Sequence, residues 1–528
     1  MKKYILGLAI IHFVFLFPLF KTGIFDTHDG QLHIARIAAY DKAITDGQFP
    51  VRWAANLNYN YGSPLFIFYY PLPYMLGTLV HRIGFDFTDS FKILLGLAFV
   101  FAPASFYLWM KTLVSSRIAA VSALVYGLSP YHFLDLFVRG AIGELFAFVS
   151  VPIVLLGIEK IYNRDFKVGF LLVSSFYAIL ILSHNAFALL FSAVIIFYAL
   201  LRLRETKQWL VLSAAILLGL GVTAHFWLPS MIEQKYSHVE LFTSTKYLDN
   251  FPKLGQLIWS PWGLGKEVTK SGGLSPQIGP IQILMVFLSL CFLKRIKGNR
   301  WLFWFGITLF IAGIYFSLDA SIFIWNHVTF LKRFEFPWRF TGLISFAAAI
   351  MSAFLLMHKP NNIVLLAISS GLILLAIPLT RTAQNINYPN SFYETYGHST
   401  DFGGASTIWT AGDPFAYPKS SIEIISGNAF ISKYQRQSTR HTFSVHAATD
   451  SKILDNTLYY PGWKAYVDNR EIPIQFQDSN HRGLITFDVP KGESKVKVFF
   501  EETTFRKIAD IISILSVIVL MVIFVFSL

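Results

Sequence analysis

The stretch GIFDTHDGQLHIARIAAYDKA, residues 23–43, follows directly on a strongly apolar segment and is rich in ionisable side chains. Asp26, His28, Asp29, His33 and Arg36 fall within eleven positions. The chain otherwise avoids charge, since 14% of its residues are charged and 54% are hydrophobic, against roughly 25% charged residues in ordinary soluble domains. A cluster of this kind beside an apolar segment predicts polar chemistry at the edge of a membrane.

Apolar runs of membrane-crossing length recur along most of the 528 residues. A transmembrane helix needs about 20 predominantly apolar residues. We therefore expect a polytopic α-helical membrane protein with about twelve transmembrane helices, the first an uncleaved anchor. The expected spans are 4–20, 91–111, 117–130, 142–160, 168–182, 186–203, 209–228, 280–294, 301–317, 337–357, 361–379 and 507–528.

Basic residues cluster in alternate connections between these spans, and the positive-inside rule makes those connections cytoplasmic. Both termini are then expected inside. The net charge of +13 thus follows from topology rather than from nucleic-acid binding, because the basic residues form short scattered groups. The lone Cys291 excludes a disulfide within the chain. The basic clusters lie at 2–3, 111–117, 160–167, 202–207, 294–300 and 358–359.

Two further segments of the expected transmembrane domain, 1–379, are predicted to lie on the membrane rather than cross it. Residues 64–84 are apolar, but counting them as a span would place the later basic clusters outside. Prolines and aromatic residues in this segment suit the headgroup boundary. We therefore expect interfacial helices at about 29–47 and 64–84 on the outer face.

The pattern changes after residue 379. Apolar and polar residues alternate in HTFSVHA and SKVKVFFE, and turn signals such as DNRE and PKGE separate the runs. Residues 380–506 are therefore expected to form an extracytoplasmic β-sandwich, and residues 507–528 a final transmembrane helix.

Most unusual polar residues fall in connections that this topology places outside. Ionisable groups from several connections at one depth predict a polar pocket at the outer membrane face. Besides the opening stretch, the candidates are Asp135, Arg139, Glu144, His184, Asn185, Arg333, Glu335 and Arg339.

Each candidate also has a purely structural interpretation. Arg333 and Arg339 could anchor a helix start at the headgroups. Asp135 and Arg139, four positions apart, could form only a local ion pair. His184 and Asn185 could be a polar hairpin tip. These alternatives stay open at the level of the sequence.

The opening stretch carries its own alternatives. Asp29 precedes a glycine and could be a helix N-cap, and Asp26 could be a turn residue. Asp26, His28 and Asp29 could also hold a divalent cation, although this spacing is common by chance. The sequence therefore leaves any metal unknown.

Several long segments together resemble a known family. They are THDGQLHIARIAAYDKA and its continuation to residue 74, GLSPYHFLDLFVRGAIGELF and its continuation to residue 160, LSHN at 182–185, and RFEFPWRF at 333–340. The chain resembles the bacterial integral membrane family labelled 6-pyruvoyl-tetrahydropterin synthase-related. The late stretch YYPGWKAYVDNREIPI is similar to the external domain of membrane proteins implicated in glycosylating lipoteichoic acid. The histidine cluster of the soluble pterin enzyme is missing from the sequence.

The resemblance implies a GT-C glycosyltransferase architecture in the bacterial cytoplasmic membrane, with the active face outside. Such enzymes take a polyprenyl-phosphate-linked sugar, so the implied partners are that donor, membrane lipid and an envelope glycan or lipid acceptor. The implied acidic loop residue falls on Asp29, with Asp26 nearby.

Glycosyl transfer needs a carboxylate base and cations for the leaving phosphate. We assign catalysis to Asp29, supported by Asp26 or His28. A lipid-linked sugar transporter or flippase, or a non-catalytic scaffold that binds cell-wall polymer, are the alternatives. The donor phosphate is assigned to Arg139, Arg339, Arg333 and His184, and supporting roles to His33, Arg36, Asp135, Glu144, Asn185 and Glu335.

Overall fold

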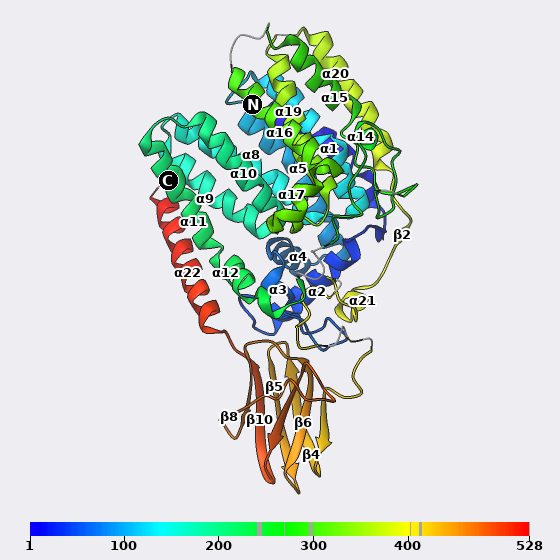
Figure 1. Ribbon diagram of the computed structural model, residues 1–528, viewed down its shortest axis with the longest axis vertical. Helices are drawn as coiled ribbons and strands as arrows, with labels where there is room; N and C mark the ends of the chain where they lie inside the picture. Colours follow the sequence, from blue (N-terminus) through cyan, green and yellow to red (C-terminus); the bar gives the residue numbers. More distant parts are fainter. Residues whose placement is uncertain are drawn as a thin grey trace.

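A computed structural model describes the chain except for residues 240–244, 269, 295–298, 359, 402, 411–413, 415 and 527–528. Parts of two expected basic clusters, 295–298 and 359, thus lie outside the described residues. A helical bundle forms one end of the molecule and a β domain the other, with short helices between them (Figure 1).

The described part of the chain contains eight helices long and apolar enough to cross a membrane, or up to ten if each of two bent pairs is one span. The expected total of twelve is not confirmed, although every expected span coincides with helix. The eight are α5 (Phe87–Met110), α8 (Ile142–Tyr162), α9 (Phe166–Ser183), α10 (Asn185–Arg202), α16 (Arg300–Ser317), α19 (Phe340–Leu356) with the preceding turn η5 (Pro337–Arg339), α20 (Asn362–Ala376) with η6 (Ile377–Thr380), and α22 (Thr504–Val525).

Fewer spans are found than the twelve expected because some of the helices are broken or short. The helices α1 (Lys2–Val14) and α15 (Pro280–Phe292) have 13 residues each, too few to cross a hydrocarbon core that needs about 20. In the first bent pair, α6 (Ser116–Gly127) meets α7 (Pro130–Phe133) and η2 (Leu134–Arg139) at 48°. In the second, α11 (Thr206–Val222) meets α12 (Ala224–Glu233) and η3 (Gln234–Tyr236) at 71°.

Three short helices from the first connection lie between the bundle and the β domain (Figure 1). They are α2 (Gly30–Thr45), α3 (Leu65–Phe68) and α4 (Leu72–Arg82). The expected 64–84 helix is broken before Pro71, because proline and its predecessor resist helical continuation. Most residues of α2 are buried, including Ile34, Ala35 and Ile37. This layer places the opening polar stretch at the end of the bundle that faces the β domain.

A two-stranded ribbon ties the start of the chain to the segment after the bundle. Ile24 and Phe25, in β1 (Ile24–Phe25), pair antiparallel with β2 (Asn385–Ile386). The short helix α21 (Asn390–Glu394) follows and packs against α2. Residues more than 350 positions apart therefore form one wall beside the opening stretch.

The β domain consists of two antiparallel sheets. One has the order β4-β5-β10-β7-β8 and the other β3-β6-β9, and alternate residues of β5 are buried between them. This confirms the expected β-sheet domain. Its strands are β3 (Ile422–Ser426), β4 (Ala429–Gln437), β5 (Arg440–Ala447), β6 (Ser451–Leu458), β7 (Trp463–Val467), β8 (Arg470–Ile472), β9 (Leu484–Val489) and β10 (Gly492–Phe500).

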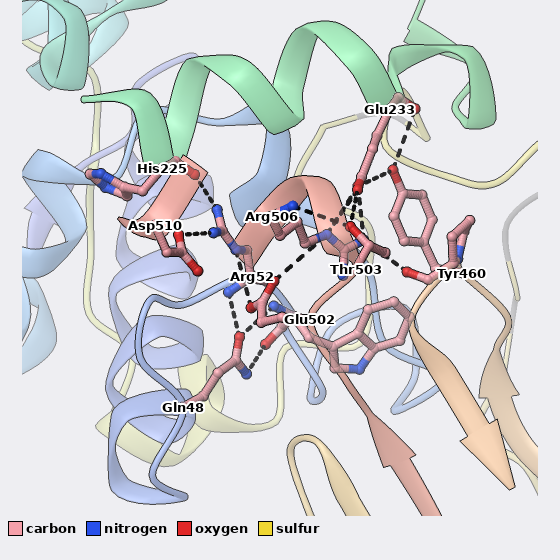
Figure 2. A network of polar contacts seen from close by, with 11 residues as sticks. Gln48, Arg52, His225, Glu233, Tyr460, Glu502, Thr503, Arg506 and Asp510 are labelled. Atoms are coloured by element: carbon pink, nitrogen blue, oxygen red, sulfur yellow. Dashed lines mark hydrogen bonds and ion pairs between the residues drawn. The ribbon is translucent and has the colours of Figure 1, made fainter. Parts of the chain in front are cut away.

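A buried polar network fastens the β domain to the bundle (Figure 2). Arg506, at the start of α22, donates from Nη2 to Glu233 Oε2 at 2.8 Å and to the Pro461 carbonyl at 2.8 Å. Tyr460 donates to the same Glu233 carboxylate at 3.2 Å. In the same figure Arg52, from the first connection, donates to Asp510 of α22 at 2.6 Å. The network thus joins the first connection, α12, the β domain and α22.

Both ends of the described chain lie on the part of the bundle that faces away from the β domain (Figure 1). The orientation of that side toward the cytoplasm stays a prediction, as does the placement of the β domain outside.

Candidate functional site

Glu144 is the centre of a buried charge cluster at the end of the bundle nearest the short helices. It lies in the first turn of α8 and is fully buried. Its Oε1 lies 2.8 Å from Arg139 Nη1 and accepts a hydrogen bond of 3.1 Å from Arg339 Nε. Its Oε2 accepts from the Tyr131 hydroxyl at 2.7 Å. One carboxylate therefore holds two guanidinium groups from separate helices.

A local backbone irregularity positions Arg139. Residues 134–139 form a π-helical turn that ends at Gly140 in the left-handed region, with φ of 67°. π-Helical turns are rare and often occur at functional sites. Arg139 also donates to Asp135 Oδ1 at 2.7 Å, and its guanidinium lies 4.7 Å from the ring centre of Trp338. The local ion pair considered as an alternative for Asp135 and Arg139 is present, but it is one part of a larger cluster.

Arg339 reaches the cluster from the turn before α19. Besides Glu144, it donates from Nη1 to the Phe334 carbonyl at 2.7 Å and to Glu335 at 3.4 Å. Within the described residues, Nη2 of Arg339 and Nη2 of Arg139 have no hydrogen-bond partner. Each arginine is therefore fixed by one side of its planar fork and keeps donors for another group.

His184 completes the cluster from the hairpin between α9 and α10. Its Nδ1 accepts from the Phe187 backbone at 3.3 Å, which caps α10, and its Nε2 lies 3.7 Å from Glu144 Oε1. It is therefore both a hairpin-tip residue and a neighbour of the charges.

The opening stretch is joined to this cluster by main-chain hydrogen bonds. The N–H of Asp29 donates to the Arg139 carbonyl at 2.9 Å, and that of His28 donates to the Val138 carbonyl at 3.0 Å. Asp29 occupies the N-cap position of α2, yet its side chain makes no capping bond; Thr27 Oγ1 accepts from Gly30 instead, at 2.9 Å. Among the described residues no hydrogen bond engages the Asp29 carboxylate, so the N-cap interpretation does not account for it.

His28 and Asp26 differ in their surroundings. Burial, together with the charges of Arg139 and Lys266, holds the pKa of His28 below its usual range, so the ring is neutral at neutral pH. Its Nε2 lies 3.1 Å from the Leu264 carbonyl, which can only accept, so Nε2 carries the proton. Nδ1 is then an acceptor, and no described residue donates a hydrogen bond to it. Asp26 is exposed, with a weak 3.4 Å contact to Gln31.

His33 and Arg36 form a second polar group around Tyr74 of α4. His33 Nδ1 lies 3.0 Å from the Tyr74 hydroxyl, to which Arg36 Nη1 also donates at 3.0 Å. Arg36 also donates to Thr400, which follows α21. Burial holds the pKa of His33 well below its usual range. Tyr70 stacks on Tyr74 and packs against His184, so it separates this group from the Glu144 cluster.

Two candidates lie outside both groups. Arg333 is exposed and donates to Gln234 at 3.1 Å. Asn185 is exposed and donates to the Phe68 carbonyl at 2.9 Å, which ties the hairpin to α3. Both have structural contacts that explain them.

The sequence interpretation missed four partners of the candidates, namely Tyr131, Trp338, Tyr74 and Thr400. Tyr131 and Trp338 lie within the polar segments singled out above, where buried aromatics beside charges could have been a signal. No pattern in a single sequence links Thr400 to Arg36. Among the described residues, no group of three or more His, Cys, Asp or Glu side chains comes together as a metal site.

The arrangement has a definite chemical capability. It offers guanidinium donors for an anion, a neutral imidazole acceptor, and the Asp29 carboxylate, which has no hydrogen-bond partner in the part of the chain that the structure describes. This combination suits a reaction in which one group loses a proton while another leaves as an anion.

Residues 66–386, more than half of the chain, match the model of a family described as 6-pyruvoyl-tetrahydropterin synthase related domain, a membrane protein. No curated protein matches the chain.

Solved structures with a similar course of the chain include two transferases. A variant of the arabinofuranosyltransferase AftD from Mycobacteria has a TM-score of 0.47 and 14% identity, and the match covers 72% of this chain and 27% of that one. The oligosaccharyltransferase of Archaeoglobus fulgidus, tethered with an acceptor peptide, has a TM-score of 0.43 and 15% identity, over 80% of this chain and 61% of that one. This chain therefore spans less than two thirds of either protein, and the likeness carries no functional argument.

Proposed function

This chain belongs to the membrane-protein family described as 6-pyruvoyl-tetrahydropterin synthase related, and from its polar cluster we propose that it is a membrane glycosyltransferase. The proposed reaction moves a sugar from a polyprenyl-phosphate-linked donor to a glycan or lipid acceptor of the cell envelope, on the extracytoplasmic side. The observation that supports the proposal is the main-chain hydrogen bond between Asp29 and Arg139, which joins the loop that carries the Asp29 carboxylate to the turn that carries the Arg139 guanidinium.

The proposed chemistry follows from these groups. An acceptor hydroxyl attacks the anomeric carbon, a new carbon–oxygen bond forms, and the bond from that carbon to the donor phosphate breaks. Asp29 takes the hydroxyl proton, and the electron pair leaves with polyprenyl phosphate. His28 Nδ1 can orient the hydroxyl as a hydrogen-bond acceptor.

The guanidinium groups of Arg139 and Arg339 receive the leaving phosphate. A planar fork matches phosphate oxygens, and hydrogen bonds between charged groups are roughly twice as strong as neutral ones. Glu144 keeps the two arginines in place before the donor arrives, so the site needs little rearrangement on binding. Asp26, which is exposed, is the alternative base.

The test uses purified protein in liposomes with a radiolabelled polyprenyl-phosphate sugar and a crude envelope acceptor fraction. We expect labelled acceptor and free polyprenyl phosphate to appear together and to depend on Asp29. If labelled donor instead crosses the bilayer intact, the protein is a flippase. If it is neither cleaved nor moved, the scaffold interpretation holds.

A further inference from the structure

A surface groove of about 610 Å³ shares no lining residue with the polar cluster. Three segments form its walls: the turn η1 (Phe17–Phe20) and its continuation, the loop at 261–262, and the turn η6 (Ile377–Thr380) and its continuation. We call it the Lys21–Arg381 groove. Its principal lining residues are Phe17, Pro18, Lys21, Trp262, Ile377 and Arg381.

The apolar wall of the groove, which includes Phe17 and Ile377, is exposed on the protein surface. Phe17 and Ile377 are 55% and 54% exposed. The span Asn362–Thr380, which ends in the groove, has only 22% of its apolar window buried within the protein. A membrane-spanning helix with so little protein contact leaves most of its apolar surface to the lipid. One wall of the groove therefore continues into the apolar surface of the bundle.

Two cationic side chains, Lys21 and Arg381, also line the groove. Lys21 and Arg381 are exposed, and among the described residues neither side chain has a carboxylate partner. Their backbones, in contrast, are held: Lys92 donates to the Lys21 carbonyl at 3.0 Å, and Trp262 Nε1 donates to the Arg381 carbonyl at 3.1 Å. Two positioned main-chain segments thus present two free positive charges above an apolar wall.

We propose that the Lys21–Arg381 groove binds an anionic glycerophospholipid of the surrounding leaflet. Its phosphodiester lies between the Lys21 ammonium and the Arg381 guanidinium, and its acyl chains lie along Phe17 and Ile377. A soluble anion would leave that apolar wall uncovered, and a zwitterionic lipid would bring its own cation against the two already present. Volumes of roughly 300–1,000 Å³ are typical of sites for small molecules, so a headgroup with its glycerol fits. This proposal does not depend on glycosyl transfer.

The groove has a direct connection to the polar site. The loop that carries Trp262 continues to Leu264, whose carbonyl holds His28. Lys21 precedes Asp26 by five residues, which span at most about 18 Å of extended chain. A bound lipid would therefore contact the loop whose Leu264 carbonyl orients the His28 imidazole.

Native mass spectrometry of the purified full chain tests the proposal, with phosphatidylglycerol and phosphatidylcholine as competing probes. We expect preferential retention of phosphatidylglycerol and about a fivefold loss for each cation removed in Lys21→Gln and Arg381→Gln, the effect typical of one basic residue near an anionic surface. The charge-retaining pair Lys21→Arg and Arg381→Lys should restore it.

A matched control removes two exposed cations at the opposite end of the bundle, Arg204 between α10 and α11 and Lys207 in the first turn of α11, in R204Q and K207Q. This control should retain phosphatidylglycerol as the wild type does. A photoactivatable phosphatidylglycerol should label peptides that contain 17–21 or 377–382. Equal retention of both lipids, unchanged retention in the double glutamine variant, or displacement by glycerol 3-phosphate at equal concentration would each overturn the proposal.

Discussion

The main-chain N–H of Asp29 donates a hydrogen bond of 2.9 Å to the carbonyl oxygen of Arg139. The loop with the proposed base and the turn with the proposed phosphate ligand are therefore joined without either side chain. Substitutions of those side chains can change the chemistry while the two elements stay together.

Replacement of Asp29 by Asn should lower turnover by about 10²- to 10⁴-fold, the usual contribution of a general base. The amide keeps the size of the side chain but cannot take the proton. Radiolabelled sugar transfer in liposomes measures the effect. Asp41→Asn, in the helix that Asp29 precedes, is the matched control. Among the described residues the Asp41 carboxylate pairs with Arg82 alone, at 2.7 Å, and partly exposed pairs contribute little. Asp26→Asn should have a smaller effect, and a larger one would move the base to Asp26.

Replacement of Arg339 by Gln should reduce kcat/KM for the donor by about 10- to 150-fold, because a hydrogen bond to a charged group contributes roughly 1.5–3 kcal/mol. Steady-state kinetics with varied donor concentration checks this. Arg333→Gln is the control, because Arg333 is exposed and contacts Gln234 rather than the cluster. Equal losses in the two variants would contradict the assignment of the phosphate to Arg339.

Gly140→Ala should disturb the junction between the opening stretch and the π-helical turn. A Cβ at Gly140 would lie 2.8 Å from Thr27 Oγ1, in a backbone with φ of 67°. Gly47→Ala has a similar positive φ of 84° but nothing within 4 Å of its Cβ, so it isolates the backbone strain, about 1 kcal/mol. Thermal unfolding should show a greater loss for Gly140→Ala, and transfer activity should fall only in that variant.

Acid should destabilise the protein partly through His28. Its pKa is depressed in the folded chain, mainly by burial, so the neutral ring stabilises the fold above its unfolded pKa, about 6.5. That stabilisation is lost as the pH falls below this value toward the folded pKa. Thermal unfolding between pH 7.5 and 5.5 should therefore show a smaller loss in His28→Gln than in the wild type. Parallel profiles would show that His28 does not take part.

The Arg506–Glu233 ion pair should be essential for attachment of the β domain. Arg506→Ala leaves Glu233 buried without its cation, and such a loss typically costs about 3–5 kcal/mol. Thermal unfolding and limited proteolysis between the bundle and the β domain should both show the change. The neighbouring Lys507 is exposed, so Lys507→Ala should behave as the wild type, and similar behaviour of Arg506→Ala would show that the network of Figure 2 is dispensable.

Much of the helical framework was predictable, because the length of an apolar run must match the thickness of the bilayer. The number of membrane-spanning helices was not predictable, since helix breaks such as the one between Val222 and Ala224 depend on packing rather than composition. The alternating pattern likewise predicted the β domain, but not the order of its strands.

The sequence allowed us to predict which residues belong to the polar cluster, but not how they pair. The segments with Arg139, Glu144 and Arg339 stood out because charge is rare in this chain. Their pairing through Glu144 and the π-helical turn depends on how helices meet in space. The exposure of Arg333 and Asp26, close in sequence to buried candidates, also reflects tertiary packing that one sequence does not encode visibly.

The ribbon formed by β1 and β2 has a consequence for biogenesis. Phe25 and its partner Asn385 are more than 350 positions apart, and most of the bundle lies between them in the chain. During synthesis the opening loop therefore stays without its partner strand until the intervening helices have been made, and only then can β2 complete the wall beside it.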